Sequence, residues 1–251
     1  MLLEGKNAIV YGGGGAIGSA IGAAFGAAGA RVNLVGRTAE KLQRAAQEIR
    51  AAGGEVEAAD LDALDEVAVD RHADDVAARC GGIDISVNTI SLGESFGTPL
   101  AGTDPAEFER PALTAVRSNF LTARAAARHM IRQRSGVLLT FGGYGDPLSD
   151  FYLGGFQVAL SAVDALRRQL AAELGPYGIR VLTIQSTGVP ETIPEEYEER
   201  DTITESIVSR TMLRRAATLQ DVGNVAAFAA SDHACAMTAT KLNITCGAEV
   251  D

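Results

Sequence analysis

The residues with the clearest chemical potential form a glycine-rich segment at positions 11–18, between a short apolar run and a helix pattern of small residues. Glycine lets the backbone approach a pyrophosphate closely, and the helix that follows presents unpaired N–H groups and the positive end of its dipole. The segment therefore predicts a nucleotide cradle, with a plain glycine-rich turn as the alternative. The expected contacts are Gly12, Gly14, Gly15, Ala16, Ile17 and Gly18.

The end of the second apolar run bears on which dinucleotide would bind. An Asp or Glu there would bind the ribose 2′-hydroxyl of NAD, but this chain has Gly36 and Arg37. No carboxylate is present to repel a 2′-phosphate, and Arg37 can bind one through its guanidinium fork. The sequence favours NADP(H) over NAD(H). The alternative is that Arg37 is a solvated loop residue.

Residues 142–176 comprise a glycine-rich loop and an Ala/Leu-rich helix pattern that closes at Gly175-Pro176. The segment resembles the active-site strand and helix of the short-chain dehydrogenase/reductase family, in which a helix carries Tyr-x-x-x-Lys and a Ser lies thirteen residues before the Tyr. Aligned on residues 170–176, the Tyr position holds Phe156, the Lys position Leu160 and the Ser position Gly143. The resemblance therefore implies the family's fold, but the aligned positions of this chain lack the family's usual proton-transfer groups.

The resemblance extends over nearly the whole chain. The family's relay Asn falls on Ala115, with Asn119 one turn away. The glycine turn is similar to the family's Thr-Gly-x-x-x-Gly-x-Gly, with Tyr11 in place of Thr, and the bulky ring is expected to affect the floor of the pocket. Further cofactor contacts implied by the resemblance are Asp60, Leu61, Asn88, Thr89 and Thr187.

Other side chains could replace the missing groups. Tyr152 lies four residues before Phe156 and would share its helix face if the helix begins that early. Tyr144 lies in the loop over the cleft. A packed tyrosine or a loop residue that meets water is the alternative for each. We expect no cation to help, because no lysine is near the helix in sequence, and Arg167 and Arg168 are predicted to face solvent.

Three functions fit these residues. The leading one is an NADP(H)-binding oxidoreductase with a non-standard proton donor, which is Tyr152, a water or the substrate. The second is a non-redox enzyme (a dehydratase, isomerase or cyclase) that uses an apolar cleft lined by Ile90, Phe156 and Leu160. The third is a catalytically silent subunit that binds cofactor or supports an active homologue. The expected substrate is a small molecule of apolar character.

Apolar runs alternate with helical patterns from end to end. Strands separated by helices imply right-handed crossovers and a parallel sheet covered on both faces. The prediction is a single Rossmann-like α/β domain over residues 1–251, with the Glu-rich segment 190–215 as a flap on the substrate side or a solvated helix face. The predicted strands are residues 8–11, 31–35, 56–59, 83–87, 137–141, 179–184 and 242–245.

Composition limits the partners. The net charge of −10 would repel phosphate backbones and anionic membrane surfaces, so nucleic acid and membranes are not expected as partners. No apolar run approaches the roughly 18 residues of a membrane span, and the three cysteines show no metal or disulfide spacing. We expect a cytoplasmic protein that forms a homo-oligomer, a dimer or tetramer, or a mixed oligomer with an active homologue.

Overall fold

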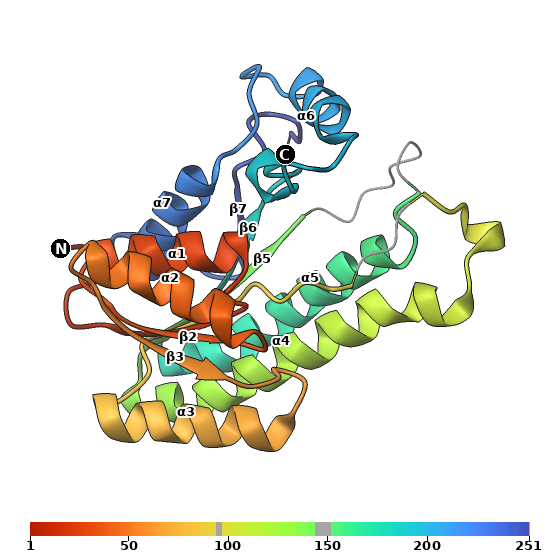
Figure 1. Ribbon diagram of the computed structural model, residues 1–251. Coiled ribbons are helices and arrows are strands. Elements are labelled where there is room, and N and C mark those ends of the chain that lie inside the picture. The colour runs from red at the N-terminus through yellow and green to blue at the C-terminus, as the bar shows by residue number, and fades with distance from the viewer. Residues whose placement is uncertain (94–96, 144–151, 251) are drawn as a thin grey trace.

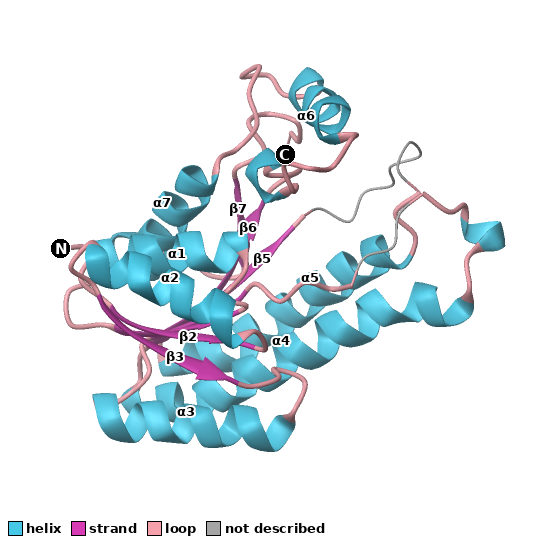
Figure 2. Cartoon of the chain, viewed as in Figure 1, coloured by secondary structure: helices cyan, strands magenta, loops and turns pink. Residues whose placement is uncertain are grey.

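The computed structural model describes residues 1–93, 97–143 and 152–250, and its centre is a seven-stranded sheet (Figures 1 and 2). All strand pairs are parallel, and the order is β3-β2-β1-β4-β5-β6-β7. The strands are β1 (Asn7–Tyr11), β2 (Arg31–Gly36), β3 (Glu55–Asp60), β4 (Ile85–Asn88), β5 (Gly136–Gly142), β6 (Ile179–Gln185) and β7 (Thr240–Asn243). The predicted Rossmann-like architecture is confirmed.

Helices cover both faces of the sheet. The helices α1, α2 and α7 pack on one face, and α3, α4 and α5 pack on the other (Figure 1). The α-helices are α1 (Ala16–Ala27), α2 (Ala39–Ala51), α3 (Glu66–Cys80), α4 (Pro105–Gln133), α5 (Gly155–Leu174), α6 (Arg200–Ser209) and α7 (Leu219–Ala230). Short 3₁₀ helices are η1 (Leu100–Gly102), η2 (Gly175–Tyr177), η3 (Pro190–Thr192) and η4 (Asp232–Ala234).

The strand pattern explains why there are two cores. Successive side chains of a strand point to opposite faces, so Ala8 and Val10 of β1 join the core under α1, α2 and α7, while Ile9 and Tyr11 join the core under α3, α4 and α5. Because both faces are covered, the central strands are mostly apolar, with Ser86 and Asn88 of β4 as buried polar exceptions.

The direction of the chain reverses at the centre of the sheet. After β1 the chain adds β2 and β3 on one side, and it then returns to place β4 on the other side of β1. Ligands of open α/β sheets bind at such a switch point, beyond the carboxyl ends of the strands. The glycine turn after β1 and residues 88–89 at the end of β4 therefore meet at this point.

Some element boundaries differ from the prediction. Helix α3 begins at Glu66, because the Asp65 carboxylate accepts hydrogen bonds from the N–H groups of Val67 and Ala68 and so caps the helix there. The last strand begins at Thr240, two residues early, because Thr240 pairs with Leu182 of β6.

Segment 190–215 connects β6 to α7 and contains η3 and α6. Helix α6 lies beyond the carboxyl ends of β5, β6 and β7 (Figure 1). A carboxylate oxygen of Glu191 accepts a hydrogen bond of 2.6 Å from the N–H of Leu219, which ties the start of the segment to the first turn of α7. The segment is thus placed on the side of the sheet where the predicted ligand site lies.

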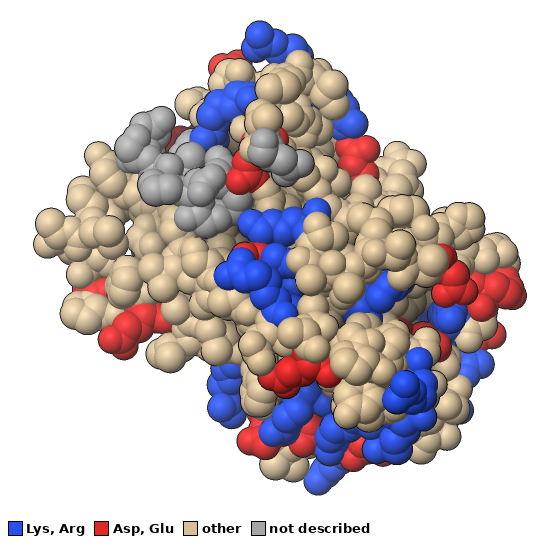
Figure 3. Space-filling model, turned by 180° about the vertical axis from the view of Figure 1, so that it is seen from behind, with Lys and Arg blue, Asp and Glu red and all other residues tan. Residues whose placement is uncertain are grey.

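Surface charge is not uniform, although the chain carries a net charge of −10. The face seen from behind mixes both signs, and Lys and Arg side chains gather near its middle and along its lower part (Figure 3). Among the described residues, no helix combines the length and apolar character needed to cross a membrane.

Candidate functional site

The glycine turn is held by close contacts that only glycine permits. Gly12 has a positive φ of 84°, and a methyl group on it would lie 2.6 Å from the backbone oxygen of Thr89. A methyl group on Gly18 would lie 2.2 Å from the carbonyl oxygen of Gly12 and 2.8 Å from Thr89 Oγ1. The Thr89 hydroxyl donates to the Tyr11 carbonyl at 2.9 Å. Thr89 therefore packs into the turn and fixes its shape.

The other part of the turn is open to solvent. Gly15 and Ala16 are exposed, and Gly15 precedes α1 without any side chain capping the helix. A helix N-terminus without a side-chain cap presents unpaired N–H groups and a partial positive charge. The turn therefore fits the pyrophosphate of a dinucleotide, with Gly14, Gly15, Ala16 and Ile17 as the residues that would face it.

The ring of Tyr11 does not enter the turn. It is fully buried in the core under α3, α4 and α5, with the ring of His72 at 6.5 Å between centroids. Burial, and then the negative charge of Asp70, raises the pKa of the Tyr11 hydroxyl. The expectation that this ring affects the pocket floor is therefore wrong, because the alternation of side chains along β1 points it to the opposite face of the sheet.

Two cationic side chains border the turn. Arg37 follows β2 and is exposed, and it forms no ion pair within the described part of the chain. Lys41, in the first turn of α2, is also exposed, and its Cβ lies 3.1 Å from where a methyl group on Gly14 would be. This edge can accept a phosphate group.

The remaining predicted cofactor contacts lie at the ends of β3, β4 and β6. Asp60 is exposed, and the N–H of Leu61 donates to the Gly36 carbonyl at 3.0 Å. Asn88 is buried, and its side chain donates to Thr122 Oγ1 at 3.1 Å and accepts from a backbone N–H two residues on at 3.0 Å. Thr187 is half-buried just after β6.

The four positions that the sequence alignment predicts for the family's proton-transfer residues come together in space. Ala115 of α4 and Phe156 of α5 lie in one apolar cluster. Gly143 and Leu160 are neighbours, because a methyl group on Gly143 would lie 3.2 Å from Leu160 Cδ1. A longer side chain at position 143 would therefore press against Leu160, so these two residue types fit each other.

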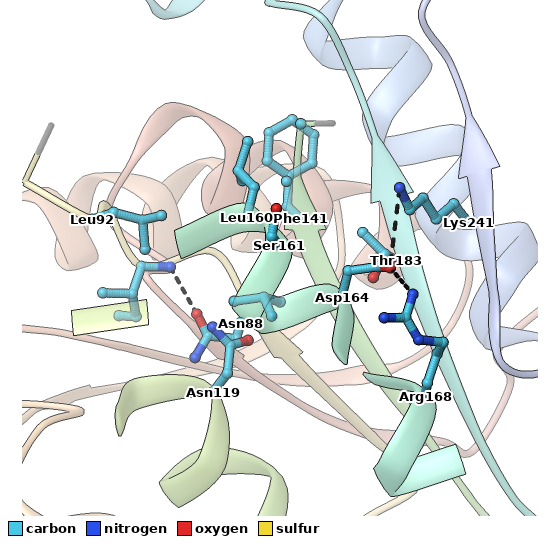
Figure 4. Close-up of a pocket in the computed structure, with 14 residues that line it drawn as sticks. Asn88, Leu92, Asn119, Phe141, Leu160, Ser161, Asp164, Arg168, Thr183 and Lys241 are labelled. Carbon is cyan, nitrogen blue, oxygen red and sulfur yellow. Dashed lines mark hydrogen bonds and ion pairs between the residues drawn. The ribbon is translucent and has the colours of Figure 1, made fainter. Parts of the chain in front are cut away.

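A cavity of about 260 Å³ is lined by Gly143 and Leu160, but not by Ala115 or Phe156, and continues along α5 (Figure 4). Its lining includes residues of β4, β5, β6 and β7 besides α4 and α5, so it is formed by strands far apart in the sequence. The lining residues are Asn88, Ile90, Leu92, Asn119, Phe141, Gly142, Gly143, Leu160, Ser161, Val163, Asp164, Arg168, Thr183 and Lys241. The polar ones among them show that the cleft is not uniformly apolar.

Two expectations about basic residues are wrong. Lys241 of β7 lines the cavity beside α5, and its Nζ lies 3.9 Å from an Asp164 oxygen. Arg167 is only 5% exposed and does not face solvent, because its side chain turns back to hydrogen-bond Asp164. Arg168 is 60% exposed as expected, but it also lines the cavity. The sequence did not predict that Lys241 lies beside α5, because the neighbours of Lys241 are set by the pairing of β7 with β6.

Asn119 is the residue that α4 contributes to the lining of the cavity, and it is buried. Its side-chain nitrogen donates to the Ala115 carbonyl at 2.9 Å, and its Oδ1 has no hydrogen-bond partner among the residues described. Asp164 could have been found from sequence, because Phe156, Leu160, Asp164 and Arg168 are spaced four apart and so share one face of a helix.

The proton-donor candidates are less well placed. Helix α5 begins at Gly155, so Tyr152 does not share its first turn. Gly154 has φ 49° and ψ −123°, and a methyl group on Gly155 would lie 1.9 Å from the Phe108 carbonyl oxygen, which fixes the start of the helix against α4. Tyr152 itself is 49% exposed with a positive φ of 48°. Tyr144 lies outside the described residues.

Comparisons with known proteins agree on one family. The family model described as "Enoyl-(Acyl carrier protein) reductase" matches residues 14–249. A Rhizobium meliloti protein named "Probable galactose dehydrogenase GalD" is 29% identical and is matched over 98% of this chain and 95% of its own. A 3alpha-hydroxysteroid dehydrogenase of Mediterraneibacter gnavus is 28% identical, with 97% of each chain covered. A solved short-chain type dehydrogenase/reductase from Mycobacterium marinum has a TM-score of 0.87 at 26% identity, covering 98% of this chain and 96% of that one.

Proposed function

Since the chain belongs to the short-chain dehydrogenase/reductase family of oxidoreductases, we propose that it binds NADP(H) at the switch point and moves hydride between this cofactor and a small molecule. The observation that carries the proposal is the glycine turn. Thr89 packs against Gly12 and Gly18, while Gly15 and Ala16 are exposed to solvent at the N-terminus of α1, which has no side-chain cap. The cofactor supplies or accepts the hydride when bound.

The residues of the chain would hold the dinucleotide along the carboxyl ends of the strands. Asp60 and Leu61 would border the adenine, and Asn88, Thr89 and Thr187 the nicotinamide end. Asn88 supports this assignment, because its hydrogen bond to Thr122 Oγ1 holds the side chain in one orientation beside the cavity.

The preference for NADP(H) is supported by charge at the end of β2. Arg37 is exposed and without an ion pair among the described side chains, and Lys41 borders the same turn. A guanidinium binds a phosphate through charge-assisted hydrogen bonds worth about 1.5–3 kcal/mol. The 2′-phosphate of NADP(H) would supply the negative charge that pairs with Arg37 and Lys41.

Fluorescence titration with NADPH and NADH tests both parts of this proposal. We expect Arg37→Ala to raise the Kd for NADPH about tenfold or more and to leave the Kd for NADH unchanged. Arg71→Ala is the matched control, because Arg71 is an exposed arginine of α3, on the other side of the sheet. Equal wild-type affinities for the two nucleotides would contradict the preference. Binding of neither nucleotide below millimolar concentration would overturn the oxidoreductase proposal.

The source of the proton differs from the family's usual one in this proposal. Ala115, Gly143, Phe156 and Leu160 cannot donate a proton from their side chains. Tyr152, a water or the substrate itself would supply it. If Tyr152 is the donor, Tyr152→Phe lowers turnover about 10²-fold or more and leaves the NADPH affinity unchanged.

A non-redox reaction in the same cavity is the second candidate. The observation that favours it is a cluster of apolar side chains in the lining of the cavity, which includes Ile90, Leu92, Phe141 and Leu160. Such a cluster shields a reacting group from water without offering a proton. Turnover of a substrate in the absence of any nicotinamide nucleotide would establish this function in place of the first.

Association of two copies is supported by an apolar stripe on α4. Leu113, Val116 and Phe120 are exposed, and their spacing places them on one helix face. A second copy of this chain would bury that stripe. We expect light scattering to show an oligomer for the wild-type protein and a smaller species for Leu113→Arg. A monomeric wild-type protein would refute this part of the proposal.

A further inference from the structure

The cavity along α5 has two chemically different ends. Leu92 and Leu160 lie at the end where the family carries its reaction centre, and Asp164, Arg168 and Lys241 lie together at the other end (Figure 4). A ligand that fills the cavity therefore meets apolar side chains and charged side chains at once. The charged end lies outside the four positions at which the family carries its proton-transfer residues.

Three cations share a single carboxylate at the charged end. Asp164 Oδ1 accepts hydrogen bonds from Arg167 Nη2 at 2.7 Å and Arg167 Nε at 3.3 Å, and its Oδ2 contacts Arg168 Nη1. Lys241 Nζ lies 3.9 Å from Oδ1, within ion-pair range but beyond hydrogen-bond distance. Because one carboxylate balances one of three positive charges, this cluster carries an excess of two, and the Lys241 ammonium is the group least neutralised.

The Asp164 carboxyl keeps its negative charge at neutral pH. Burial would raise the pKa of the Asp164 carboxyl, but the hydrogen bond from Arg167 and the charges of Arg167, Lys241 and Arg168 together hold that pKa below its usual value. Asp164 thus stays ionised and orients the cations around it, so its role is to position Arg168 and Lys241.

A buried guanidinium belongs to the same cluster through its ion pair with Asp164, although it does not line the large cavity. Arg167 is only 5% exposed, and its Nη1 is buried with no hydrogen-bond partner in the described part of the structure. It lines a small cavity of about 20 Å³ that shares Asn88 and Asn119 with the large one. A buried charge that is incompletely paired is costly, and an anion nearby reduces that cost.

We propose that the charged end of this cavity binds an anionic group of the substrate, a carboxylate or a phosphate, through Lys241 and Arg168. The proposal rests on the proposed function in one respect: the reacting carbon of that substrate would lie at the Gly143–Leu160 end. Thr183, which pairs in register with Lys241 on the neighbouring strand, lines the same cavity, and its hydroxyl is hydrogen-bonded to that of Thr140 at 2.7 Å.

Helix geometry sets the length of the expected substrate. The charged groups of Arg168 and Lys241 lie against the Asp164 carboxylate, so Asp164 marks the level of the anion site. Leu160 and Asp164 are four residues apart on α5, so they are separated by about 6 Å along the helix axis at 1.5 Å per residue. A reacting carbonyl and an anionic group about 6 Å apart fit this spacing. A keto acid such as 6-oxoheptanoate, with four methylene groups between carbonyl and carboxylate, spans it.

Calorimetric titration of the full chain with unreactive probes tests the anion site directly. We expect hexanoate or pentyl phosphate to bind at least tenfold more tightly than the uncharged hexanamide, and the better of the two anions identifies the group. Lys241→Met should weaken that anion about tenfold or more, and Lys241→Arg should restore most of the affinity.

Lys6→Met is the matched control for this experiment. Lys6 is also a lone ion-paired lysine, with Nζ 4.0 Å from Asp232 and 29% of its side chain exposed, against 34% for Lys241. Arg168→Gln is the second variant, since Arg168 is largely exposed and its replacement disturbs packing little. Anions that bind no better than hexanamide, or an equal loss in Lys6→Met and Lys241→Met, would overturn the proposal.

A separate assay keeps the two proposals distinguishable. NADPH oxidation with 6-oxoheptanoate is compared with that of its methyl ester, and we expect the KM of the ester to be at least tenfold higher. If both compounds react equally well, the chain is an oxidoreductase without this anion site. If hexanoate binds in a Lys241-dependent way but no nicotinamide nucleotide binds, the anion site stands and the oxidoreductase proposal fails.

Discussion

Replacing Gly18 by alanine probes the turn that would hold the cofactor. The new methyl group would lie 2.2 Å from the Gly12 carbonyl oxygen and 2.8 Å from Thr89 Oγ1. The Gly12 oxygen cannot easily move, because it accepts a hydrogen bond of 2.9 Å from the N–H of Gly15. The substitution must therefore displace the backbone of the turn.

The size of the effect follows from two opposing terms. Overpacking of this kind costs about 1–3 kcal/mol, and a clash with a fixed backbone oxygen belongs at the upper end. Alanine in place of glycine within α1 returns about 1 kcal/mol of helix propensity. We expect the free energy of unfolding of Gly18→Ala to fall by about 2 kcal/mol, which corresponds to a decrease of about 4–8 °C in Tm for a domain of this size.

Urea unfolding and NADPH titration measure the two consequences of this substitution. The Kd for NADPH should rise about tenfold together with the loss of stability. Gly175→Ala is the control, because Gly175 has φ −52° and open space where the methyl group would go, so its stability should stay the same or rise by up to about 1 kcal/mol. A Gly18→Ala protein that is more stable than wild type and binds NADPH normally would refute the reasoning.

Asp164→Asn should lower the free energy of unfolding by about 3 kcal/mol at pH 6, because it leaves the buried Arg167 without its partner. The pKa of Asp164 is lowered in the folded state, so the stability that its ionised carboxylate contributes is present above the unfolded-state pKa of about 3.9 and is lost as the pH falls through the folded-state pKa. Urea unfolding at pH 6 and pH 3 should therefore show the difference in unfolding free energy between Asp164→Asn and wild type shrink in acid. A difference that is independent of pH would count against this ion pair. Thr218→Ala should cost about 1 kcal/mol, since the Thr218 hydroxyl accepts a hydrogen bond from the Asp221 N–H in a capping box. Thr38→Ala should cost less, because Thr38 makes no such hydrogen bond, and equal losses in the two variants would contradict the role of the cap.

The fold could be predicted from the sequence because the residue patterns that specify it are local. Short apolar runs separated by helical patterns specify strands and helices through side-chain periodicity, and parallel pairing then follows from the length of the connections. The residue types at Phe156 and Leu160 could be located by the same means, because an alignment along one helix needs only sequence spacing. The glycine turn was likewise visible, as a strand, a turn and a helix in immediate succession.

The direction of individual side chains required the assembled sheet. Tyr11 borders the turn in sequence, yet the alternation along β1 points its ring to the far face, into the core with His72. Helix α5 begins at Gly155, and the carbonyl of Phe108 in α4 leaves no room for a side chain at that position. Both outcomes depend on which face or which neighbouring helix meets the residue.

The charged end of the cavity depends on both local sequence spacing and the assembled sheet. The spacing of Leu160, Asp164 and Arg168 along one helix face is a property of the sequence. Lys241 joins them only because β7 pairs with β6 in a register that sets Lys241 beside Thr183. Helix periodicity is fixed by residues three and four apart, whereas strand register is fixed by the packing of the whole sheet. The sequence therefore determined the fold and predicted which four positions align with the family's proton-transfer residues. Tertiary structure alone decided which cation faces the cavity beside them.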